Sequence, residues 1–204
     1  MYQTAVFAIL GYLSGSIFYS QVAARLFGVQ DITRDTSDGN PGVFNAFAKG
    51  GFTVGLFALC GDLLKGAAPL LLWRRVCPDW MNDPLLPLMM AAPLLGTLYP
   101  VFRHFRGGKG ITVSFGILLG LIPLWKPVLL LAACFLFFSV ILVVESHYFR
   151  TLIVFAAFLA AVCLGSLAPL VKEGCVLLSV CELLTMILRY RETEPLEVHL
   201  LWKH

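Results

Sequence analysis

The chain has 204 residues, of which 59% are hydrophobic and only 13% are charged. Its mean hydropathy is +0.85, and a typical soluble domain has about 25% charged residues. This composition excludes a water-soluble globular protein and predicts an integral membrane protein that has the lipid bilayer as a partner. The formal net charge of +3 is unremarkable, and no nucleic-acid partner is predicted.

The six cysteines are scattered through apolar runs. They form no Cys-x-x-Cys pair and no Cys/His cluster, so the sequence predicts neither a disulfide framework nor a metal site. We expect them to be small core residues.

Hydrophobic runs divide most of the chain into candidate membrane spans, each of which needs about 20 apolar residues. There are seven, at residues 4–27, 53–74, 84–102, 111–125, 127–145, 151–170 and 173–188. The fourth is short and proline-terminated, so it could be a tilted or partial span. We therefore predict an all-α, polytopic integral membrane protein with about seven transmembrane helices, in a single domain over residues 1–204. Because residues 1–5 contain no Lys or Arg, we expect the first run to be a retained span rather than a cleaved signal.

Basic residues are unevenly divided between the two sides that seven spans would define. One side would hold the loops 28–52 and 103–110, the corner 146–150 and the C-terminal tail. Its ten basic residues are Arg25, Arg34, Lys49, Arg103, Arg106, Lys109, Arg150, Arg189, Arg191 and Lys203. The four on the other side are Arg74, Arg75, Lys126 and Lys172. The positive-inside rule then predicts that the first side and the C-terminus are cytoplasmic and that the N-terminus is outside.

The loop 28–52 is the longest and the least apolar. Its Asp-Gly, Asn-Pro and Pro-Gly steps predict consecutive tight turns rather than helix or strand. Gly39, Asn40 and Gly42 could expose backbone N–H groups to an anion. The alternative interpretation is a flexible connector.

A second polar segment, Arg103-His104-Phe105-Arg106-Gly107-Gly108-Lys109-Gly110, separates two apolar runs. Its glycines can adopt positive φ and let the backbone approach a ligand closely, and successive N–H groups in such a turn form an anion-binding concavity. A helix that begins near Ile111 would direct its positive end at the same point. The segment predicts a phosphate or carboxylate site; the alternative is a basic loop that anchors a helix end.

Three acidic or basic side chains lie in predicted spans away from the span ends, namely Asp62, Lys65 and Glu182. Asp62 and Lys65 share a helix face, and we favour a structural ion pair over a contribution to the site. Glu182 has no predicted partner. The polar residues 145–148 could face the same cleft, but we favour a membrane-interface belt for them.

Taken together, these segments resemble the bacterial acyl-phosphate:glycerol-3-phosphate acyltransferase (PlsY) family. The resemblance covers about residues 10–120. It rests on Gly15-Ser16-Ile17, Leu26-Phe27-Gly28, Asp31-Ile32, Gly39-Asn40-Pro41-Gly42, Asn45, Asp62-Leu63-Leu64-Lys65-Gly66, Pro100-Val101-Phe102, Phe105-Arg106-Gly107-Gly108-Lys109-Gly110 and Ser114-Phe115-Gly116.

The resemblance implies a seven-span membrane enzyme of phospholipid synthesis with its site on the cytoplasmic face of the bacterial inner membrane. It would transfer an acyl group from acyl phosphate to glycerol 3-phosphate and give lysophosphatidate. It implies no cofactor, because acyl phosphate is already activated. The implied catalytic residues are Lys109 and Asn45. The implied substrate-binding residues are Gly39, Asn40, Gly42, Gly107, Gly108, Gly110, Arg103, Arg106 and Arg150.

Several family positions carry other residues in this chain. Asp38 stands for a serine, Ala48 for an arginine and Thr97 for a histidine; Phe149 and Arg150 stand for serines, and Tyr190 and Thr193 for a histidine and an asparagine. Arg103, His104, Arg150 and Arg191 are candidate replacements. These differences leave open a catalytically inactive or repurposed homologue that binds a phospho-ligand, a lipid or a protein partner. A transporter or small channel is a third class, but it would need more polar residues along the spans.

Overall fold

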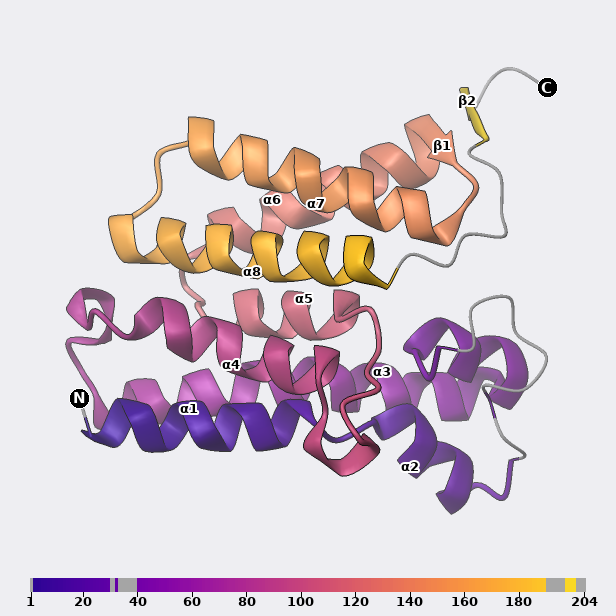
Figure 1. The fold of residues 1–204 in the computed structure, drawn as a ribbon, viewed down its shortest axis with the longest axis horizontal. Helices are drawn as coiled ribbons and strands as arrows, with labels where there is room; N and C mark the ends of the chain where they lie inside the picture. Colours follow the sequence, from indigo (N-terminus) through magenta and orange to yellow (C-terminus); the bar gives the residue numbers. More distant parts are fainter. Residues whose placement is uncertain (1, 30–31, 33–39, 190–196, 201–204) are drawn as a thin grey trace.

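The computed structural model describes residues 2–29, 32, 40–189 and 197–200, and the chain in these ranges is predominantly helical. The helices of the described ranges pack in one bundle, with α2 inclined to the others (Figure 1). They are α1 (Tyr2–Gly15), α2 (Tyr19–Leu26), α3 (Val43–Val76), α4 (Leu86–Leu98), α5 (Ile111–Leu119), α6 (Trp125–Leu136), α7 (His147–Leu164) and α8 (Pro169–Leu188). Two 3-10 turns are η1 (Trp80–Asn82) and η2 (Val101–Arg103), and the π-helical turn η3 (Phe137–Ile141) continues α6.

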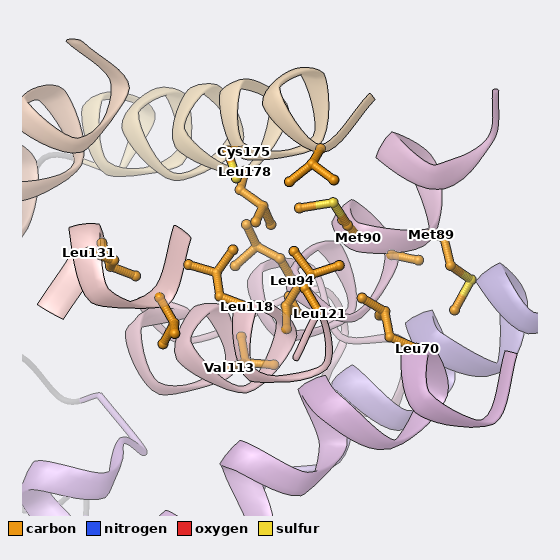
Figure 2. Close-up of a cluster of buried hydrophobic side chains, with 14 of the residues drawn as sticks. Leu70, Met89, Met90, Leu94, Val113, Leu118, Leu121, Leu131, Cys175 and Leu178 are labelled. Atoms are coloured by element: carbon orange, nitrogen blue, oxygen red, sulfur yellow. The ribbon is translucent and has the colours of Figure 1, made fainter. Parts of the chain in front are cut away.

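The helices pack around an apolar core. Helix α4 contacts α1 and α8, α3 contacts α1 and α5, and α7 contacts α6 and α8. Figure 2 shows part of the core, which includes Leu70, Met89, Met90, Leu94, Val113, Leu118, Leu121, Leu131, Cys175 and Leu178. Because lipid is as apolar as these side chains, close packing rather than removal from water holds such helices together.

Small residues let the backbones of α1 and α4 come into direct contact. A Cβ added at Gly15 would lie 2.0 Å from the carbonyl oxygen of Pro93, and one added at Gly96 would lie 2.0 Å from that of Tyr12. The Thr97 hydroxyl lies 2.9 Å from the carbonyl oxygen of Gly15. Only glycine fits at Gly15 and Gly96 without separating the two helices.

The predicted spans correspond to the helices in different ways. The first is a bent pair, α1 and α2, with an angle of 47° between them. In the described ranges, three helices are long and apolar enough to cross a membrane, at Val43–Val76, Leu86–Arg103 and His147–Leu164, or four if the bent pair is one span. Helix α5 has nine residues, so it is only about 14 Å long. The number of seven spans therefore stays a prediction.

Two sequence predictions about local structure are wrong. The run 127–145 is not helical to its end, because β1 (Leu142–Val144) pairs antiparallel with β2 (Val198–Leu200) near the C-terminus. This pairing joins two segments far apart in the chain, and no local sequence pattern indicates that they pair. The loop 28–52 is also shorter than predicted, because α3 begins at Val43 and continues through a kink at Gly51, where φ is 77°.

Candidate active site

A cavity of about 390 Å³ lies where the starts of α3, α5 and α7 meet. Its lining comes from residues 40–45, from residues 108–113, and from His147, Arg150 and Thr151 at the start of α7. Figure 1 shows that these three helices begin at the same end of the bundle. Both glycine-rich segments therefore contribute to one cavity.

Residues 40–45 are held by hydrogen bonds to their own backbone. The Asn45 side-chain amide donates to the Asn40 carbonyl at 2.7 Å, and the backbone N–H of Gly42 donates to the same oxygen at 2.8 Å. The buried Ser20 hydroxyl of α2 donates to the Pro41 carbonyl at 2.6 Å. These bonds fix the first turn of α3, whose N–H groups have no partner within the helix, at the edge of the cavity. Gly39 lies outside the described residues.

The second glycine-rich segment packs against the C-terminal end of α4. The Gly108 N–H donates to the Thr97 carbonyl at 3.1 Å, and a Cβ added at Gly107 would lie 2.1 Å from that oxygen. Gly110 has φ of 71° and is the N-cap of α5. Among the described residues of this segment, the left-handed conformation falls on His104, Phe105 and Gly110. Gly107 and Gly108 are thus needed for close approach rather than for the positive φ predicted from sequence.

The start of α7 adds an arginine–histidine pair. The Arg150 guanidinium contacts His147 Nδ1, and because a guanidinium can only donate, Nδ1 accepts and the neutral imidazole carries its hydrogen on Nε2. The His147 ring packs against Phe44 of α3, with the ring centroids 4.6 Å apart. Ser146 is the N-cap of α7 and accepts from the Phe149 N–H at 3.4 Å.

The electrostatic character of the cavity is positive. Lys109 and Arg150 contribute full charges, and the N-terminal ends of α3, α5 and α7 each carry a partial positive charge. Together these groups suit one or two phosphate anions.

The one acidic side chain in the described lining, Asp62, is paired with Lys65 at 3.0 Å. Lys65 Nζ also donates to the Ile17 carbonyl at 2.8 Å, in the break between α1 and α2. The pair is therefore structural, as the sequence favoured, and its Asp62 also lines the cavity.

Three predicted site residues do not line the cavity. Gly107 lies behind it, against Thr97. Arg103 stacks on Phe18, with its Cζ atom 4.7 Å from the centroid of the ring that lines the cavity. Arg106 lies in the same loop and outside the lining.

His147 and Thr97 line the cavity but were not predicted as site residues. His147 therefore faces the cavity, which was the alternative to the favoured interface belt. The sequence feature that could have indicated this is its position three residues before Arg150, on the same helix face. Thr97 directs its hydroxyl to the backbone of Gly15 and Pro93, so it has a packing role. Within the described ranges no three His, Cys, Asp or Glu side chains are grouped as metal ligands would be.

Comparison with known proteins agrees with this arrangement. The family model described as glycerol-3-phosphate acyltransferase matches residues 5–195. Curated proteins named glycerol-3-phosphate acyltransferase are similar. The one from Pseudomonas paraeruginosa is 40% identical over 126 residues, 62% of this chain and 63% of that protein. The one from Dechloromonas aromatica is 36% identical over 122 residues, 60% of each chain. The matched region thus spans about three fifths of each of these two relatives. The one from Bordetella pertussis is 36% identical over 154 residues, 76% of this chain and 68% of that protein.

Two crystal structures of PlsY, an integral membrane glycerol 3-phosphate acyltransferase, have a similar fold. The glycerol 3-phosphate form has a TM-score of 0.71 at 24% identity and covers 91% of this chain and 87% of its own. The lysophosphatidic acid form has a TM-score of 0.69 at 26% identity and covers 92% and 88%. The fold and the family match over residues 5–195 lead to one conclusion: this chain belongs to the glycerol-3-phosphate acyltransferase family of integral membrane proteins.

Proposed function

We propose that this protein transfers an acyl group from acyl phosphate to the 1-hydroxyl of glycerol 3-phosphate, which gives lysophosphatidate and inorganic phosphate. The observation that carries the proposal is that Lys109, Arg150 and three helix N-termini meet in one cavity. Both substrates are phosphate esters or anhydrides, so the reaction requires two anions to be held close together against their mutual repulsion. The names of the relatives and the ligand forms of the PlsY structures support the same reaction.

The cavity also suits the transfer of the acyl group between the two substrates. In the reaction, a bond forms between the hydroxyl oxygen and the acyl carbon, the bond from that carbon to the phosphate oxygen breaks, and the leaving phosphate takes up the hydroxyl proton. The protein contributes mainly by positioning the two substrates and by stabilising negative charge. Apolar lining residues such as Phe44, Phe47 and Phe135 suit the start of an acyl chain that enters from the bilayer.

The proposed roles follow from position. Lys109 and Asn45 act at the reacting groups, and Asn40, Gly42, Gly108, Gly110 and Arg150 bind substrate from the cavity wall. Gly39 would extend the substrate-binding segment 40–45. Gly107 shapes the other glycine-rich segment by packing against Thr97, outside the cavity lining. Arg103 and Arg106 would attract anions toward the cavity from outside it. The positive-inside pattern supports a cytoplasmic site and an external N-terminus, and the family resemblance supports the bacterial inner membrane as the location.

A direct test measures lysophosphatidate formation by purified protein from acyl phosphate and radiolabelled glycerol 3-phosphate. Lys109→Ala should lower kcat/KM about ten- to hundredfold, because a charged hydrogen bond to phosphate contributes about 1.5–3 kcal/mol. Lys126→Ala is the control, since Lys126 is an exposed lysine at the start of α6 and lies outside the cavity lining. Absence of product from the wild-type protein, with glycerol 3-phosphate binding retained, would contradict the proposal.

A further inference from the structure

The strand β2 lies beside β1 at the end of the bundle where α7 begins (Figure 1). A further backbone bond, 3.1 Å from the Glu145 N–H to the Glu197 carbonyl, continues the pairing toward the helix. Only residues 145 and 146 separate β1 from α7. A segment from near the C-terminus therefore holds the chain immediately before His147 and Arg150, which both line the cavity.

The register of the two strands decides where their backbone groups point. Val143 lies opposite His199, and Val144 lies opposite Val198. In an antiparallel pair, hydrogen-bonded residue pairs alternate with pairs whose backbone groups point away from the partner strand. The bond made by the Glu145 N–H places Val143 and His199 in the hydrogen-bonded class. The Val144 carbonyl is thus directed away from β2 and is available to another donor.

Arg150 is the donor to the Val144 carbonyl. One terminal nitrogen of its guanidinium, Nη1, donates to this oxygen over 3.5 Å, and the other, Nη2, contacts His147 Nδ1. A guanidinium has five N–H donors in a rigid fork, so these two contacts hold its plane while other donors can meet an anion. The position of the Arg150 side chain in the cavity lining therefore depends on where β1 holds Val144.

The start of α7 also has supports that do not involve β2. The Tyr148 hydroxyl donates to the Met186 carbonyl of α8 at 3.1 Å, and the His147 ring packs against Phe44. A two-stranded ribbon is only marginally stable by itself, and here each strand has three residues. Loss of the pairing should therefore shift the Arg150 side chain without unfolding α7.

We infer that β2 is a positioning element for Arg150: its pairing with β1 holds the Val144 carbonyl in place, and this carbonyl directs the Arg150 guanidinium at a phosphate group in the cavity. The inference deepens the proposed function and rests on it, since it takes Arg150 as a substrate-binding residue. It gives β2 no contact with substrate, because the residues 197–200 that the structure describes lie outside the cavity lining.

Proline substitutions in β2 separate the pairing from the mere presence of the strand. His199→Pro removes the N–H that faces Val143, and so breaks the pairing. Val198→Pro is the matched control, because it changes a position whose N–H points away from β1. His199→Ala is a second control: it keeps the backbone bond and removes only the imidazole, whose Nδ1 lies 3.6 Å from Glu145 Oε1.

The experiment measures the binding of glycerol 3-phosphate and of inorganic phosphate by calorimetry, the KM and kcat of acyl transfer, and thermal stability, each on the full chain. His199→Pro should raise the Kd for both anions and the KM for glycerol 3-phosphate about three- to tenfold, within the range of couplings between interacting residues. Its kcat and unfolding temperature should change little, and both controls should stay close to the wild type. A purely structural role of β2 would instead lower the unfolding temperature and leave Kd and KM unchanged.

A double variant tests whether the effect passes through Arg150. In an Arg150→Ala background, His199→Pro should weaken the binding of glycerol 3-phosphate no further. Equal Kd values for His199→Pro and Val198→Pro, or an equal loss in both backgrounds, would overturn the inference. If the wild-type protein binds glycerol 3-phosphate but forms no lysophosphatidate, the proposed function fails, and the binding comparison still decides the role of β2.

Discussion

Arg150 and His147 show how single residues at the start of α7 can contribute to a cavity that is otherwise lined largely by glycine-rich segments. The guanidinium fixes the imidazole tautomer, and both side chains line the cavity. Arg150 occupies a position at which the resemblance leads one to expect serine. The structure places a permanent cation there, in the lining of the cavity, whereas Ala48 stands where an arginine was expected.

Replacement of Arg150 should therefore affect substrate affinity. Arg150→Ala should raise the KM for glycerol 3-phosphate about tenfold, because one charged contact to phosphate is lost, and Arg150→Lys should have a smaller effect. Steady-state kinetics measure both. Arg75→Ala, at an exposed arginine near the end of α3, serves as the control, and equal KM values for Arg150→Ala and Arg75→Ala would exclude this role.

Residue by residue, most of the predicted site residues that line the cavity lie in segments with a local sequence signature. Asn40, Gly42, Asn45, Gly108, Lys109 and Gly110 lie in turn-forming or glycine-rich segments, and the structure places all six around one cavity. His147 carries no such signature. Its surroundings come from helices that are distant in sequence, so its place in the cavity lining became visible only when the packing of α7 was known.

At the level of elements, the contact between α1 and α4 lies next to the cavity, because Phe18, three residues after Gly15, and Thr97 of α4 are both in its lining. Gly15→Ala should destabilise the protein by about 1–3 kcal/mol, since the new Cβ would overlap a backbone carbonyl that cannot move freely. Thermal unfolding in detergent measures this effect.

Gly11 provides the matched comparison for this prediction. It lies one turn earlier on the same face of α1, and its added Cβ would meet Pro93 Cγ at 3.3 Å rather than a backbone oxygen at 2.0 Å. Gly11→Ala should therefore cost clearly less than Gly15→Ala. Equal unfolding temperatures for the two variants would show that the close contact between α1 and α4 does not limit stability.

The lengths and ends of elements were predicted less well than their existence. Hydropathy indicated apolar segments at α1 to α8, but α5 is too short to cross a bilayer by itself, and α3 begins inside a predicted loop. The pairing of β1 with β2 joins residues 142–144 to 198–200. Helix ends and strand pairing depend on tertiary contacts, and a single sequence does not specify these locally.

At the level of the whole molecule, composition alone predicted a helical membrane protein, and the fold shared with the PlsY structures confirms that class. The convergence of three helix N-termini could not be predicted, because it depends on how α3, α5 and α7 are arranged in the bundle. That arrangement turns two separate loops and one helix start into a single positively charged cavity.

The most direct measurement is an experimental structure of the protein with glycerol 3-phosphate bound. The proposed function predicts that the phosphate group lies within about 3 Å of Lys109 Nζ and of backbone N–H groups from one of the two glycine-rich segments, inside the cavity shared by residues 40–45 and 108–113. A phosphate bound elsewhere, or the two segments in separate recesses, would contradict the account.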